Sequence, residues 1–129
     1  MSEPVIQRWH RIVETRDSSA LGALLADEAV FHSPVVHTPQ RGRELTAKYL
    51  TAALAVFGDR LRYVREIVGE RDAVLEFEAE LDGIHVNGVD LIRWNDAGRI
   101  VDFKVMVRPL KAINLLHEKM AERLQAHRP

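Results

Sequence analysis

The sequence predicts an α+β fold in which helices lie against one face of a curved antiparallel sheet. Apolar residues recur at helical spacing in the first half of the chain, whereas apolar and polar residues alternate in the second half. Turn signals separate the alternating segments. A length of 129 residues favours one domain with one core, expected over residues 1–129. Helices followed by strands therefore predict a sheet wrapped around N-terminal helices, closed by a C-terminal helix, with a cone-shaped interior whose mouth can admit a small molecule.

Four helices are predicted from apolar residues spaced three or four positions apart. The first follows Pro4, which suits a first helical turn, and the second follows capping residues at 17–19. The third spans residues 43–57 and ends at Gly58, and the last opens at Pro109. Their apolar faces are Val5, Ile6, Trp9, Ile12 and Val13; Leu21, Leu24 and Leu25; Leu45, Tyr49, Ala52, Ala53 and Val56; and Leu110, Ile113, Leu116, Met120 and Leu124.

Four strands are predicted to form an antiparallel meander over residues 60–68, 73–81, 85–94 and 99–107. Residues 73–81 alternate between apolar side chains and a row of acidic ones, the pattern of a half-buried strand. Turn signals at 69–72, at Asp82-Gly83 and at 95–98 separate the strands. A brief strand at 28–32 precedes a loop over 35–42, which is rich in proline and glycine.

Composition narrows the classes of function. With 18 basic and 19 acidic residues the net charge is −1, and no block of like charge is present, so neither a nucleic-acid partner nor a membrane surface is expected. The absence of cysteine excludes disulfides and thiolate chemistry. The N-terminus has no apolar signal core, and the longest uncharged apolar run, residues 49–58, is too short to span a bilayer. We therefore expect a cytoplasmic protein.

No cofactor or metal is expected. The six histidines show no ligand spacing with carboxylates, and the glycines are scattered at turns rather than gathered in a phosphate-binding loop.

Asp90 is the polar residue with the clearest functional pattern. Side chains alternate along a strand, so Asp90 shares a face with Ile92 and Trp94, while Leu91 and Arg93 share the other. A carboxylate on an apolar face must be paired, or protonated with a raised pKa. Two interpretations stay open. The carboxyl group anchors a ligand, or it is a structural group satisfied by neighbours such as Trp9, a histidine or Arg41.

Nearly the whole chain resembles the nuclear-transport-factor-like or SnoaL-like superfamily, which includes ketosteroid isomerase, polyketide cyclases and limonene epoxide hydrolase. The segments that carry the resemblance are 5–9, 25–30, 33–42 and 89–107. The resemblance implies a cone with a hydrophobic cavity for a small, largely apolar molecule, and a homodimer formed through the outer face of the sheet. It specifies activity poorly, because one fold can support many chemistries.

The catalytic positions of these relatives are only partly kept. By resemblance, the isomerase base corresponds to Ser33, its oxyanion-binding tyrosine to Trp9, and its protonated aspartate to Asp90. A serine hydroxyl cannot abstract a proton near neutral pH without a base of its own. The carboxylate that cyclases and the epoxide hydrolase carry on the last strand corresponds to Val105, within an inward face expected to be Val101, Phe103, Val105 and Val107. A steroid-type isomerase is therefore not expected.

Two function classes remain. The first is binding of a small, largely apolar molecule, with turnover by acid-assisted proton transfer or isomerisation in an isomerase- or cyclase-like enzyme. The second is a non-catalytic ligand-binding or dimeric interaction module. The candidate catalytic residues are Asp90 as the acid and His37 as a base, although a loop histidine such as His37 is ordinarily solvated. The candidate ligand-binding residues are Trp9, Ser33, Trp94, Phe103 and Val105.

Overall fold

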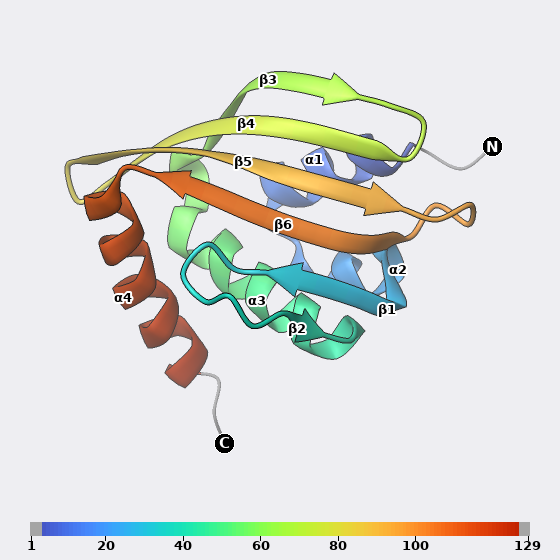
Figure 1. Cartoon of the computed structure of the whole chain (residues 1–129), viewed down its shortest axis with the longest axis horizontal. Helices are drawn as coiled ribbons and strands as arrows, with labels where there is room; N and C mark the ends of the chain where they lie inside the picture. Colours follow the sequence, from blue (N-terminus) through green and yellow to red (C-terminus); the bar gives the residue numbers. More distant parts are fainter. Residues whose placement is uncertain (1–3, 127–129) are drawn as a thin grey trace.

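The computed structural model describes residues 4–126, in which α-helices gather along one side of a six-stranded sheet (Figure 1). The sheet has the strand order β2-β1-β6-β5-β4-β3. The α-helices are α1 (Val5–Thr15), α2 (Leu21–Leu24), α3 (Arg43–Phe57) and α4 (Leu110–Ala126), with short 3₁₀ segments at Ser18–Ala20 and Gly58–Arg60. The strands are β1 (Leu25–His32), β2 (Gln40–Arg41), β3 (Arg62–Val68), β4 (Asp72–Leu81), β5 (Ile84–Trp94) and β6 (Ile100–Arg108). The predicted α+β class is confirmed.

Strands β3 to β6 form the predicted meander, and its register fixes the surroundings of Asp90. Asp90 on β5 lies opposite Leu75 on β4 and Val105 on β6. On β4, Phe77 lies between Tyr63 of β3 and Gly88 of β5. Strand β1 then joins the far side of β6 in parallel, which extends the sheet beyond the meander.

The first half of the chain differs from expectation in two places. Helix α2 is a single turn, and Leu25, expected on its apolar face, already has the extended backbone of β1. The predicted loop contains the two-residue strand β2, in which Arg41 pairs with Val30 and Gln40 with Phe31. Such a short strand carries no alternating pattern, so the sequence gives no signal for it.

A β-bulge corrects the expected inward face of β6. Ile100 pairs with Trp94, whereas Asp102 pairs with the preceding residue, Arg93, so β6 contains one extra residue. Ile100 is therefore the buried residue at the start of this face, and Val101, expected there, is only half-buried and belongs to neither core cluster. The inward positions of Phe103, Val105 and Val107 are confirmed by their packing against the core.

Two apolar clusters fill the space between sheet and helices. One joins α1 and α2 to β1, β4, β5 and β6, and the other joins α3 and α4 to β4 and β5. Helix α4 begins at Leu110 rather than at Pro109, whose carbonyl accepts from Ala112 and Ile113. No helix in residues 4–126 is long and apolar enough to cross a lipid bilayer. The cytoplasmic location stays a prediction.

Candidate functional site

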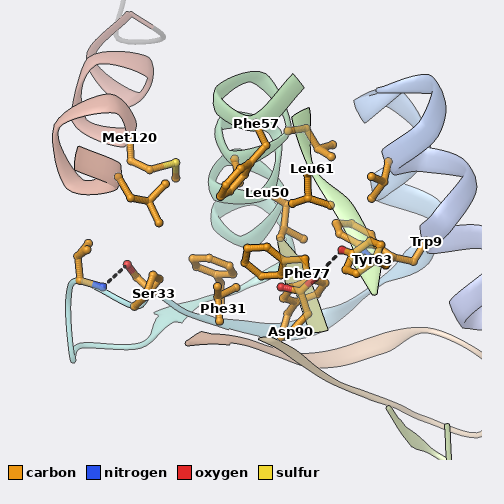
Figure 2. Close-up of a pocket in the computed structure, with 18 of the residues that line it drawn as sticks. Trp9, Phe31, Ser33, Leu50, Phe57, Leu61, Tyr63, Phe77, Asp90 and Met120 are labelled. Atoms are coloured by element: carbon orange, nitrogen blue, oxygen red, sulfur yellow. Dashed lines mark hydrogen bonds between the residues drawn. The ribbon is translucent and has the colours of Figure 1, made fainter. Parts of the chain in front are cut away.

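An apolar cavity lies between the sheet and helices α1, α3 and α4 (Figure 2). Its volume is about 60 Å³, counted for the centre of a water-sized sphere. Most of its lining is aliphatic or aromatic, and six rings contribute: Trp9, Phe31, Phe57, Tyr63, Phe77 and Phe103. The polar side chains that reach it are Ser33, Tyr63 and Asp90. The cavity therefore offers a few polar groups in an apolar surround.

Asp90 is the polar centre of the cavity and is only 5% exposed. Tyr63 reaches across β4 and donates its hydroxyl hydrogen to Asp90 Oδ2 at 2.6 Å. Trp9 of α1 in turn donates its indole N–H to the Tyr63 hydroxyl oxygen at 2.9 Å. The three side chains thus form a hydrogen-bonded chain that ends at the carboxyl group (Figure 2).

The second carboxyl oxygen of Asp90, Oδ1, differs from Oδ2 in its surroundings. No hydrogen bond to Oδ1 is found among residues 4–126, yet every fully buried polar side-chain atom in that range has a partner. Oδ1 is therefore not fully buried, and Asp90 lines the cavity. The sequence-based interpretation of Asp90 as a purely structural carboxylate accounts for Oδ2 but leaves Oδ1 without a role.

Burial controls the ionisation of this centre. Desolvation raises the pKa of Asp90 from 3.8 to about 7, and the hydrogen bond from Tyr63 lowers it only in part. Burial, followed by the charge of Asp90, raises the pKa of Tyr63 well above its ordinary value. At neutral pH the carboxyl group is therefore divided between its protonated and ionised forms, whereas the phenol keeps its proton.

Gly88 of β5 makes room for the Phe77 ring of β4. A Cβ atom at this position would lie 2.5 Å from Phe77 Cζ and 2.6 Å from the Met106 carbonyl oxygen. Because Gly88 has no side chain, the Phe77 ring lies directly over β5 and forms part of the cavity wall.

Most residues expected at the site line the cavity. Trp9, Ser33, Asp90, Phe103 and Val105 all do so. Ser33, in the loop after β1, accepts a hydrogen bond from the Val35 backbone N–H at 3.1 Å.

Two expected residues lie elsewhere. His37 is exposed in the loop before β2 and borders a shallow depression outside the cavity. Trp94 is half-buried and packs against the first core cluster, but it does not line the cavity. Within residues 4–126 no histidine lines the cavity with Asp90, and a basic role for His37 would need the loop to move.

Tyr63 is the site residue that the sequence analysis missed. Its strand has little alternation, because most of β3 is exposed at the edge of the sheet. The sequence pointed to Tyr63 only indirectly. A carboxyl group predicted to be buried needs a hydrogen-bond donor, and the chain has only two tyrosines that could supply a phenol hydroxyl. Arg41, one of the partners considered, is exposed on β2.

No group of three or more histidine, aspartate or glutamate side chains in the described part of the chain is arranged to hold a metal ion. The expectation of a site without metal or cofactor stays a prediction.

Comparison with known proteins identifies the family. Residues 6–103 match the SnoaL-like domain, and the chain belongs to this family. A steroid delta-isomerase from Pseudomonas aeruginosa is similar, with 40% identity, a TM-score of 0.91, and coverage of 95% of this chain and 90% of that one. An uncharacterised protein from Silicibacter pomeroyi with a cystatin-like fold has 34% identity and a TM-score of 0.89, over 96% and 87% of the two chains.

An NTF2-like protein of unknown function from Mesorhizobium loti is also similar, with 27% identity and a TM-score of 0.74, over 81% and 88% of the two chains. The predicted superfamily and its cone fold are thus confirmed. The fold leaves the activity open, because its members differ in function.

Proposed function

We propose that this protein binds a small, largely apolar organic molecule in the cavity and that Asp90 anchors a polar atom of it. The observation that carries the proposal is the unpartnered Oδ1 of a carboxyl group that lines an apolar cavity. Small-molecule sites are typically apolar, with a few polar groups that fix the orientation of the ligand. Asp90 and its donor Tyr63 fit this description.

The size of the cavity limits the ligand. About 60 Å³ is open to the centre of a water-sized sphere, which is a small space for a ligand. A compact molecule therefore fits the structure as it stands. A polycyclic ligand would need the cavity to widen, for example by movement of Met120 on α4 away from Ser33 (Figure 2).

Titration with small phenols tests the proposal, because their absorbance reports on the hydrogen bond formed by the hydroxyl group. We expect the wild type to bind, Asp90→Asn to bind more weakly, and Asp102→Asn to match the wild type. Asp102 is a suitable control because it lies on β6 and pairs with His32 at 2.9 Å, away from the cavity lining. Equal binding by wild type and Asp90→Asn would contradict the proposed anchor.

Proton transfer is a second candidate function, and the ionisation of Asp90 favours it. A group with a pKa of about 7 can take up and return a proton near neutral pH. Because His37 lies outside the cavity, one carboxyl group would serve as both acid and base. The 40% identity to a steroid delta-isomerase adds support from a related chain.

Exchange of the α-hydrogens of cyclopentanone in D₂O tests this candidate directly. A catalytic Asp90 would accelerate exchange above the buffer rate, and Asp90→Asn would remove the acceleration. Binding of ligands without any acceleration of exchange would leave the non-catalytic binding function alone.

We also propose a homodimer through the outer face of the sheet. On that face Ile67 pairs with Val74, Val74 with Leu91, and Val89 with Met106, which together form an apolar stripe across β3 to β6. Ile67 is 64% exposed and Met106 is 51% exposed. Three arginine–carboxylate ion pairs border the stripe: Arg62–Glu78, Arg65–Glu76 and Arg93–Asp72. Because these borders contain both positive and negative side chains, arginines of one copy can meet carboxylates of a second copy of the same face.

A further inference from the structure

We propose that the ligand of the cavity is a small protonated amine, whose ammonium group pairs with the Asp90 carboxylate while aromatic rings surround its carbon atoms. This inference rests on the proposed binding function and names the chemical class of the ligand.

The first support is the missing countercharge. None of the residues that line the cavity is lysine, arginine or histidine. Buried carboxylates in proteins are ordinarily paired with a cation, because an isolated buried charge is costly. A ligand ammonium group would supply the positive charge that residues 4–126 do not place there.

The titratable side chains that pack behind Tyr63 lie outside the cavity. The His10 ring packs edge-on against the Tyr63 ring, with centroids 5.1 Å apart, and pairs with Glu66 of β3. Neither His10 nor Glu66 lines the cavity. The titratable groups that face Asp90 are therefore Tyr63 and, beyond it, this His10–Glu66 pair.

The direction of the hydrogen bonds is the second support. Trp9 gives its N–H to Tyr63, and Tyr63 gives its O–H to Asp90, so both donors are already used. In this arrangement an ionised Asp90 presents only an acceptor, Oδ1, to the cavity. A ligand that donates a hydrogen bond fits this acceptor, whereas a carbonyl oxygen does not.

The aromatic lining is the third support. Six rings contribute to the cavity, and several of them pack in contact, with centroids 4.9 Å apart for Trp9 and Phe103 and 5.6 Å apart for Phe57 and Phe77. A cation within about 6 Å of such a ring is attracted by its quadrupole. The same rings provide the apolar contacts that the carbon atoms of an amine require.

Ionisation gives the proposal a characteristic pH dependence. Because the pKa of Asp90 is about 7, the ionised fraction of the free protein rises through neutral pH. An aliphatic amine stays protonated throughout that range. Amine affinity should therefore increase with pH until Asp90 is ionised, whereas affinity for a neutral acceptor should fall over the same range.

Three ligands of equal size separate the possibilities: cyclopentylamine, cyclopentanol and cyclopentanone. Their binding is followed by NMR through the indole N–H signal of Trp9, whose hydrogen bond to Tyr63 makes it a reporter of the site. The proteins are the wild type, Asp90→Asn and the control Asp102→Asn. We expect the amine to bind at least ~10-fold more tightly than either neutral ligand, because only the amine gains a charge pair and a cation–π contact.

The control should match the wild type, and Asp90→Asn should lose the preference for the amine. Amine affinity should also rise between about pH 5.5 and about pH 8. Tighter, Asp90-dependent binding of the ketone or alcohol would overturn the amine inference and leave the proposed binding function standing. An unchanged preference for the amine in Asp90→Asn would also overturn the inference. Binding by none of the three ligands would overturn both.

Discussion

At Asp90 two physical effects act in opposite directions on one ionisation. Burial raises the pKa of the carboxyl group, and the hydrogen bond from Tyr63 lowers it, but burial is the larger effect. An ionised Asp90 is therefore a cost to the fold rather than a contribution. The stability of the fold therefore gives no reason for an ionised carboxyl group at this position.

The stability of the fold should record this cost. Because the pKa of Asp90 is about 7 in the folded protein and near ~3.9 when unfolded, the folded state holds the extra proton between those values. The contribution of Asp90 to the free energy of unfolding should therefore fall as pH rises from about 4 to about 7, by at most ~1.4 kcal/mol per pH unit.

Asp90→Asn cannot titrate, so subtracting its unfolding free energy from that of the wild type isolates the contribution of Asp90. Chemical denaturation across this pH range should show the wild type losing stability relative to the variant, with no further change once Asp90 is ionised. A difference that stays constant, or that grows in favour of the wild type with rising pH, would contradict the raised pKa.

Tyr63→Phe tests the middle of the hydrogen-bonded chain. Asp90 loses the bond that favours its ionised form, so its pKa should rise further, and the Trp9 N–H loses its acceptor. Leaving a buried donor without a partner costs about 1–3 kcal/mol.

Carboxyl-carbon NMR titration measures the pKa of Asp90, and denaturation measures the stability. Tyr49→Phe, which removes a hydroxyl from α3, is the matched control and should leave the pKa of Asp90 unchanged.

Individual residues were predictable from the sequence to the extent that strand alternation determines them. Asp90 was found because its neighbours Ile92 and Trp94 marked an inward face. Tyr63 was missed because the exposed edge strand β3 lacks that pattern. His37 was expected near the cavity from its loop, but a loop gives no periodic signal for the direction of a side chain. The sequence thus identified the buried carboxyl group of Asp90 but not Tyr63, which donates a hydrogen bond to it.

Among the elements, Gly88 of β5 is where the side chain of β4 and the backbone of β6 leave no room for a Cβ atom. An Ala side chain there would meet both the Phe77 ring and the Met106 carbonyl oxygen. Since the backbone oxygen cannot turn aside, Gly88→Ala should lower the free energy of unfolding by about 1–3 kcal/mol and disturb the cavity wall.

Gly22→Ala is the control for this substitution, because no atom lies within 4 Å of the added Cβ in helix α2. It should be neutral or slightly stabilising, by less than ~1 kcal/mol. Thermal or chemical denaturation distinguishes the two variants, and a Gly88→Ala protein as stable as Gly22→Ala would contradict the close packing of Phe77.

The elements with a sustained period were predicted well, and the irregular ones were not. Strands β4 to β6 and helices α1 and α3 carry their patterns over many residues. In contrast, the passage from α2 to β1 places Leu24 in a helix and Leu25 in a strand, and apolar residues in succession suit both. The bulge at Val101 shifts the pattern by one residue, a change that alternation alone cannot reveal.

At the scale of the whole molecule, the two faces of the sheet carry different side chains. The inner face carries the cavity, the aromatic rings and Asp90. The outer face carries the apolar stripe of Ile67, Val74, Val89, Leu91 and Met106, bordered by paired charges. Strand β5 contributes Asp90 to one face and Val89 and Leu91 to the other, because side chains alternate along a strand.

Met106→Glu tests whether the outer face joins two copies of the chain. Met106 is 51% exposed in the single chain and lies opposite Val89, so a glutamate there should be tolerated by the fold but should place a charge in the proposed interface. We expect the wild type to sediment as a dimer at micromolar concentration and Met106→Glu to sediment as a monomer. Leu110→Glu, at a residue that is 71% exposed at the start of α4, is the control and should remain dimeric. A monomeric wild type, or a dimer unaffected by Met106→Glu, would exclude this face as the interface.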